Sequence, residues 1–151
     1  MKEDIKHLSN DLLFNPSFVK PCTINKLSES NLEVIKPYIA PSFCYDNAIT
    51  SARLVNAENI VYGAVRVKLN NEWHSIEHCW IRLNGIDYDP TYEVILKEHQ
   101  KSQIDYFSLF SVETNDFDTL TKQIGHALGA VAGLDFHWFR KAPKFEQYFI
   151  N

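Results

Sequence analysis

Residues 77–91, EHCWIRLNGIDYDPT, decide the fold, because they contain two short alternating segments joined at Asn84-Gly85. Asn-Gly is a strong signal for a two-residue β-hairpin, since both central positions of a type I′ turn need a positive φ. The residues before the turn predict a strand over 73–83, and those after it predict a strand over 86–92. We therefore expect a tight antiparallel hairpin around which the rest of the chain is arranged.

The register of this hairpin brings a histidine close to a carboxylate. Counting outward from the turn, Arg82 faces Asp87, so that aspartate is expected to form a cross-strand ion pair. Trp80 faces Asp89, and because side chains alternate between the faces of a sheet, both share the face of His78. Asp89 is then diagonal to His78, at a backbone spacing of roughly 7–8 Å that longer side chains bridge. We expect Asp89 to hold a ring nitrogen of His78, with Trp80 shielding this contact from water.

The remaining segments predict strands in the middle of the chain and helices on either side. Alternating residues rich in Val and Phe predict further strands over 59–69 and 104–112. Helical apolar spacing or capping residues occur in four other segments: 5–14, 27–39, 48–59 and 115–128. In the second of these, Ser28 is placed to cap the start and Pro37 to end the helix. The order indicates an α+β fold in which helices pack on a small antiparallel sheet.

The chain has the length of a single domain, and we expect residues 1–151 to form one. Within it we expect a helical N-terminal wrap over 1–40 and a core over 43–112. Residues 115–151 are expected to supply a helix and an aromatic tail that packs back on the core. Neither an internal repeat nor a linker divides the sequence.

Composition narrows the classes of function. The chain is 45% hydrophobic and 23% charged, which is ordinary for a globular protein. Its net charge of −4 and the absence of a basic patch argue against nucleic acid as a partner. The charged start MKEDIKHLSNDLLF does not fit a secretion signal, and no apolar run reaches the roughly 20 residues that cross a bilayer. Three cysteines without a CxxC motif fit a reducing compartment, so we expect a cytoplasmic protein without a membrane partner.

One cysteine lies where a nucleophile could be activated. Cys44 follows a Pro-Ser-Phe entry, and with Ser42 as the N-cap it would occupy the first turn of a helix. There the helix dipole and the free backbone N–H groups stabilise a thiolate and an oxyanion. Cys79 is expected on the face of the hairpin opposite His78, inside the packing, and Cys22 is expected to be inert. The spacing alone does not establish that Cys44 and His78 meet.

Several motifs resemble the transglutaminase-like branch of the papain-type cysteine hydrolase superfamily. They are CYDNA at 44–48, VYGAVRV at 61–67 and EHCWIRLNGIDYDPTY at 77–92, which are similar to motifs of a group of small bacterial and phage proteins. The resemblance covers about residues 43–92. It implies a papain-like core with Cys44 as nucleophile, His78 as general base and acid, and Asp89 as the orienting acid. The family usually has Ala where this chain has Cys79, and the flanks 1–40 and 95–151 do not share the resemblance.

The resulting hypothesis is a cysteine-dependent acyl-transfer enzyme: an amidase or peptidase, a deamidase or a transglutaminase. Its substrate would be a protein, a peptide or a small amide or thioester, and no cofactor is expected. Trp80, Asn47 and Tyr62 are the candidate substrate-binding residues, although a structural role also fits Asn47.

Two other classes compete with this hypothesis. In the first, the protein keeps the fold without the chemistry and acts by binding or inhibiting another protein. An exposed aromatic tail could serve that role, whereas a buried tail would only fill the core. In the second, His74, His78 and Cys44 bind zinc. A strand separates positions i and i+4 by about 13 Å, which is too far for two ligands of one ion.

Overall fold

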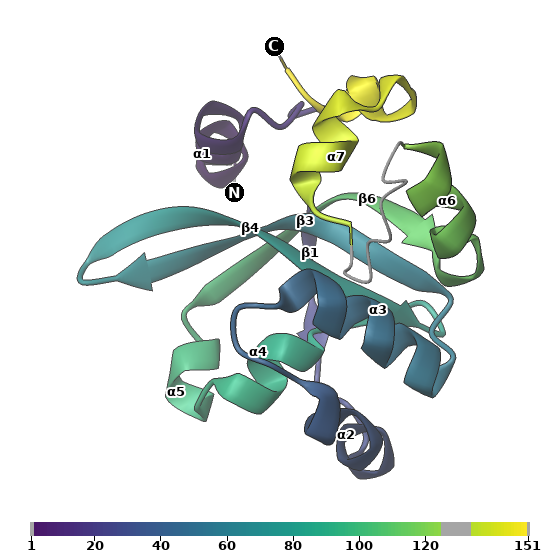
Figure 1. The fold of residues 1–151 in the computed structure, drawn as a ribbon. Helices are drawn as coiled ribbons and strands as arrows, with labels where there is room; N and C mark the ends of the chain where they lie inside the picture. The colour runs from purple at the N-terminus through teal and green to yellow at the C-terminus, as the bar shows by residue number, and fades with distance from the viewer. Residues whose placement is uncertain (1, 125–133, 151) are drawn as a thin grey trace.

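The computed structural model describes residues 2–124 and 134–150, and it is an α+β structure with one mixed sheet (Figure 1). The strands are β1 (Lys20–Cys22), β2 (Ile24–Asn25), β3 (Asn59–Leu69), β4 (Glu72–Leu83), β5 (Ile86–Tyr88) and β6 (Ile104–Glu113). The α-helices are α1 (Lys2–Leu12), α2 (Glu29–Ile35), α3 (Cys44–Val55), α4 (Pro90–Ile95), α5 (Glu98–Lys101), α6 (Phe117–Gln123) and α7 (Phe136–Lys141). Short 3₁₀ helices are η1 (Lys36–Tyr38), η2 (Thr114–Asp116) and η3 (Pro143–Tyr148).

The long hairpin of β3 and β4 is the centre of the sheet. The strand order is β1-β6-β3-β4-β5-β2, and every pair is antiparallel except β2 with β5, which is parallel. The expected turn is confirmed, because Asn84 and Gly85 both have positive φ, 54° and 78°. The register is also confirmed, since Arg82 pairs with Asp87 and Leu83 with Ile86.

A single extended segment links the two edges of this sheet. Residues 20–22 pair with β6 at one edge, and residues 24–25 pair with β5 at the other, with only Thr23 between them. Because one short segment bonds to both edges, the sheet must curl around the side chains between them. The N-terminal wrap expected over 1–40 therefore contains the helices α1 and α2 but also two short strands that were not expected. These pairings are set by distant strands, and the local sequence, which includes Pro21, carries no alternating signal.

Helices lie on both sides of the curled sheet. Figure 1 shows α1 and α7 above the long strands and α2, α4 and α5 below them. The tail packs on the core as expected, because Phe136, Phe139 and Phe145 are all buried. The helix expected over 115–128 is described as η2 followed by α6, and its expected end lies outside the described residues.

The strand expected over 86–92 ends earlier than the sequence indicated. β5 stops at Tyr88, Asp89 becomes the N-cap of α4, and Pro90 begins that helix. Proline is favoured in the first turn of a helix, where no backbone N–H is required, and aspartate is a preferred N-cap. The Asp-Pro pair therefore starts a helix where alternation alone predicted a continuing strand.

Candidate active site

Cys44 is the first residue of the twelve-residue helix α3, so its expected place at a helix start is confirmed. The expected cap is wrong, because the N-cap is Phe43 and Ser42 has a left-handed φ of 69°. No side chain caps this start, whereas Ser28 caps α2 and Asp89 caps α4. The N-cap side chain therefore offers no hydrogen-bond acceptor to the backbone N–H groups of the first turn of α3.

His78 lies on β4, and its ring points to the face of the sheet that the 20–25 segment closes. Nε2 is 2.8 Å from Asp89 Oδ2, and both side chains are only 2% exposed. Asp89 reaches the ring from the N-cap of α4, where its Oδ1 also accepts a hydrogen bond of 3.3 Å from the Tyr92 backbone N–H. The expected His–Asp contact is present, although it joins a strand to a helix start instead of two strand neighbours.

Cys44 lies near enough to the His78 ring to act on its pKa, through its charge and a side-chain interaction. Since Nε2 is taken by Asp89, Nδ1 is the ring nitrogen left to exchange a proton with the sulfur. Burial lowers the pKa of His78, but the Asp89 charge and hydrogen bond, together with Cys44, outweigh burial and raise it to about 9. The raised pKa favours the imidazolium form of the ring at neutral pH, with the Asp89 carboxylate bonded to its Nε2.

Two tyrosines complete the surroundings of the ring, and neither was singled out from the sequence. Tyr92 of α4 stacks on His78 with ring centroids 4.3 Å apart. Tyr106 of β6 donates a hydrogen bond of 2.5 Å to Asp89 Oδ2. Tyr106 occupies an alternating position of an expected strand, but only the pairing of β6 with β3 brings it to His78. The sequence contains no local signal for that pairing.

Asp87 takes the structural role expected for it. Its carboxylate accepts a hydrogen bond of 2.7 Å from Arg82 Nε and one of 3.0 Å from Trp80 Nε1. Trp80 is fully buried, with its ring centroid 6.1 Å from that of His78, so it covers one side of the site. The two aspartates thus have different partners. Asp87 binds Trp80 and Arg82, and Asp89 binds His78.

The three candidate substrate-binding residues, Trp80, Asn47 and Tyr62, are buried and do not offer a surface to a substrate in this structure. Asn47 Nδ2 donates to the Ala40 carbonyl and to Thr91 Oγ1, at 2.8 and 3.1 Å, and so ties α3 to the preceding loop and to α4. The Tyr62 hydroxyl donates to the Leu134 carbonyl at 2.7 Å, inside the aromatic core. Sequence reasoning placed these residues near Cys44 but could not determine that their polar atoms are used internally.

The other cysteines differ from Cys44 in their surroundings. Cys79 is fully buried among core residues on the opposite face from His78, as expected, and burial raises its pKa well above the usual value. Cys22 lies at the end of β1, half-buried as Cys44 is, and burial also raises its pKa. Of the three thiols, Cys44 is the one that acts on the pKa of His78.

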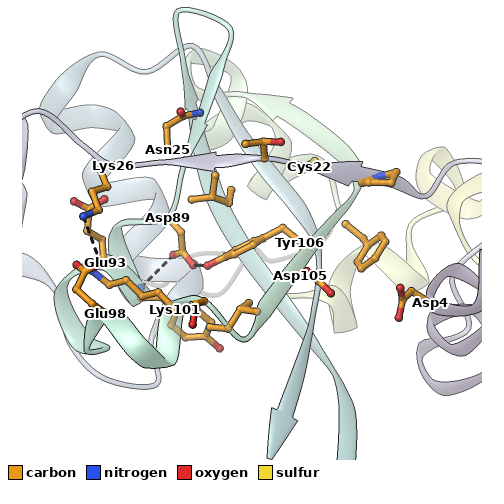
Figure 2. Close-up of a pocket in the computed structure, with 17 residues that line it drawn as sticks. Asp4, Cys22, Asn25, Lys26, Asp89, Glu93, Glu98, Lys101, Asp105 and Tyr106 are labelled. Carbon is orange, nitrogen blue, oxygen red and sulfur yellow. Dashed lines mark hydrogen bonds and ion pairs between the residues drawn. The ribbon is translucent and has the colours of Figure 1, made fainter. Parts of the chain in front are cut away.

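A pocket of about 680 Å³ opens next to Asp89 (Figure 2). Asp89 and Tyr106 lie at its centre, the 20–26 segment forms one wall, and α4, α5 and β6 form the other. Neither Cys44 nor His78 lines it, so among these three residues only Asp89 borders the pocket. Phe43, directly before Cys44, is by contrast 56% exposed.

Metal binding and membrane insertion receive no support from the described part of the chain. Within residues 2–124 and 134–150, no group of three His, Cys, Asp or Glu side chains is arranged to hold a metal ion. Among the helices of the same residues, none combines the length and apolar content needed to cross a bilayer.

Comparison with known proteins adds no relative. No family model, no curated protein and no solved structure matches the chain.

Proposed function

We propose that the protein is a cysteine-dependent acyl-transfer enzyme with Cys44 as nucleophile, His78 as general acid and base, and Asp89 as the orienting acid. The observation that carries the proposal is the contact series itself. Cys44, the first residue of α3, acts on the pKa of an imidazole whose Nε2 is 2.8 Å from a buried carboxylate. A nucleophile, a base and a group that orients the base, in mutual contact, form the arrangement that thiol acyl transfer requires.

The first half of the proposed reaction forms a thioester. The Cys44 thiolate attacks the carbonyl carbon of an amide or activated ester, and the carbonyl oxygen becomes an oxyanion. In this proposal the backbone N–H groups at the start of α3, which the N-cap side chain does not engage, donate to that oxyanion. His78, protonated at neutral pH, gives its proton to the leaving amine as the carbon–nitrogen bond breaks.

The second half restores the thiol. His78, now neutral, accepts a proton from water or from an amine that attacks the thioester. The carbon–sulfur bond breaks, and an acid or a new amide leaves. Asp89 keeps the ring oriented through both halves because its carboxylate is itself fixed by Tyr106 and by the Tyr92 backbone.

Competitive alkylation of the three cysteines tests the nucleophile. We expect iodoacetamide at neutral pH to label Cys44 at least about tenfold faster than Cys22, because a thiolate paired with an imidazolium is the reactive form. Cys22 is the matched control, since it is also half-buried and lies on the same chain. Peptide mass spectrometry measures each rate, and His78→Ala is expected to remove the difference.

A control variant and an ester assay complete the test. His74→Ala alters a histidine on the same strand that is exposed and far from Asp89, so it should leave the labelling unchanged. With p-nitrophenyl acetate, Cys44 should become acetylated as p-nitrophenolate is released, and Cys44→Ala should not. Equal, slow labelling of Cys44 and Cys22 would contradict the proposal. That outcome would favour the alternative, a catalytically silent binding protein on the same fold.

A further inference from the structure

One oxygen atom at the site accepts two hydrogen bonds. Asp89 Oδ2 accepts a hydrogen bond from His78 Nε2, with 2.8 Å between nitrogen and oxygen. It accepts a second one from the Tyr106 hydroxyl, with 2.5 Å between the two oxygens. The two donors come from β4 and β6, strands that are separated in the sheet by β3. Two donors on one carboxylate oxygen share its negative charge, so each affects how strongly the other is held.

The Tyr106 hydroxyl is fixed as a donor. Burial, and then the nearby Asp89 charge, raise the pKa of Tyr106 far above its usual value, so the hydroxyl keeps its proton. Its ring packs edge-on against Trp80, with centroids 5.3 Å apart and an interplanar angle of 86°. Its strand is paired on both sides, with Val65 of β3 and with Cys22 of β1. The hydroxyl therefore cannot leave Asp89 without disturbing the sheet.

We propose that Tyr106 is a positioning residue of the site, whose hydroxyl shares Asp89 Oδ2 with His78 and thereby sets how firmly the imidazolium holds its proton. This inference rests on the proposed function for its catalytic meaning, although the hydrogen-bond geometry stands without it. A general acid must release its proton near the working pH. By drawing charge from Asp89, Tyr106 makes the His78 proton easier to transfer.

Within residues 2–124 and 134–150, few titratable groups face the His78 ring, so the effect of Tyr106 can be isolated. They are Cys44 from α3, Asp89 and Tyr92 from α4, and Tyr106 from β6. Cys79, the neighbouring residue on β4, points to the other face.

The test is the titration of His78 followed by NMR of its ring protons in Tyr106→Phe. This variant keeps the ring and its packing and removes only the hydroxyl. We expect the His78 titration to move to higher pH by about half a unit to one unit, a three- to tenfold rise in proton affinity, because the carboxylate loses a competing donor. A titration that stays in place or moves to lower pH would overturn the proposal.

Tyr92→Phe is the matched control, because Tyr92 stacks on the same ring and its hydroxyl makes no hydrogen bond with a described residue. We expect no displacement of the His78 titration in this variant. A displacement equal to that of Tyr106→Phe would show a general effect of removing a hydroxyl and would overturn the assignment.

A second variant keeps the hydroxyl and should move the His78 titration in the opposite direction. Replacing Tyr106 with 3,5-difluorotyrosine makes the hydroxyl more acidic and a stronger donor, so the His78 titration should move to lower pH. A shift to higher pH, or no shift, would overturn the proposal even if Tyr106→Phe does not fold. Failure of selective Cys44 labelling with these NMR shifts present would reject the enzyme function and leave the role of Tyr106 in the His78–Asp89 contact standing.

Discussion

Neighbouring residues of β4 enter two very different environments. His78 points into a polar network with Asp89 and Tyr106, in which the contacts are hydrogen bonds of 2.5–2.8 Å. Cys79, one residue later, points into an aromatic core in which Tyr62 stacks on Phe110 with centroids 5.2 Å apart. Both side chains are nearly inaccessible to solvent, so the two faces do not differ in burial. They differ in their partners, which are hydrogen-bonding groups around His78 and aromatic rings around Cys79.

The polar face is stable only if every group on it has a partner. Among the described residues, the buried side-chain atoms without a hydrogen-bond partner are Ser51 Oγ, Arg66 Nε and Thr114 Oγ1, and none belongs to the His78 network. The aromatic face has no such requirement, because dispersion and the hydrophobic effect are not directional. The polar face should therefore respond to the loss of single atoms, and the aromatic face to the loss of volume.

The largest loss of stability is expected from adding a side chain at Gly63, which lies in β3 where neighbouring backbone is very close. A Cβ at Gly63 would overlap the Phe107 carbonyl oxygen and lie 2.9 Å from both Ser108 Cα and Trp80 Cη2. We expect Gly63→Ala to prevent cooperative folding, measured by circular dichroism and thermal denaturation. Gly85→Ala is the control, since nothing surrounds that position and only its φ of +78° opposes the change, at a cost of about 1–2 kcal/mol. Equal stability of the two variants would contradict this account.

The aromatic face should lose the most from a large-to-small substitution. Phe110 contacts the rings of Tyr62, Phe139 and Phe145 at centroid distances of 4.9–5.2 Å. Phe110→Ala is expected to lower the free energy of unfolding by about 3–5 kcal/mol in urea titrations. In the folded variant the NMR titration of His78 should stay near its original pH. A large shift of that titration would show that the two faces are coupled. Ser111→Ala, an exposed neighbour, should change stability by less than about 0.5 kcal/mol.

On the polar face, removal of the Asp89 carboxylate should lower the free energy of unfolding somewhat less than Phe110→Ala does. Asp89→Ala leaves a buried imidazole and a buried hydroxyl without their acceptor, and it also removes the cap of α4. We expect a loss of about 3 kcal/mol in the free energy of unfolding, together with a fall in the pKa of His78. Asp105→Ala, an exposed acid at the same pocket, is the control and should change little. Similar losses in both variants would count against a special role for Asp89.

The smallest expected effect is a dependence of stability on pH. The folded pKa of His78, about 9, lies above the ordinary value of 6.5, so protonation stabilises the folded state. That contribution is fully present below about pH 6.5 and is lost as the pH rises through 9, and it cannot exceed about 3 kcal/mol. Calorimetry should therefore show the melting temperature of the wild type falling from pH 6.5 to 9.5 more steeply than that of His78→Gln. Parallel slopes would contradict the raised pKa.

Much of the framework followed from local signals in the sequence. The alternation of 59–69 and 104–112 and the Asn84-Gly85 turn predicted β3, β6 and the end of β4, and the structure confirms them. Asp89 was the correct carboxylate, but for a reason that the alternating pattern did not contain. Pro90 ends the strand and makes Asp89 a helix cap, and from there its side chain turns toward His78.

The parts that were missed depend on contacts between distant segments. Tyr106 reaches Asp89 because β6 pairs with β3, and the 20–25 segment closes the sheet by bonding to two strands at once. Asn47 and Tyr62 were expected near a substrate, but their polar atoms are used by Thr91 and by the Leu134 carbonyl. A sequence shows which residues can donate or accept a hydrogen bond, but it does not show which partner lies within 3 Å.

The sequence alone determined which polar and titratable residues the hairpin carries and on which of its faces they lie, because a strand alternates every second residue and a type I′ turn fixes the register. Only the tertiary structure decided that Cys44 lies near enough to His78 to act on its pKa, that Tyr106 shares the Asp89 oxygen, and that the sheet closes around them. Periodicity and turn geometry act over a few residues and can be read along the chain. Contacts between strands far apart in the sequence depend on how the whole chain packs, because many pairings are locally equivalent and the shared core selects one of them.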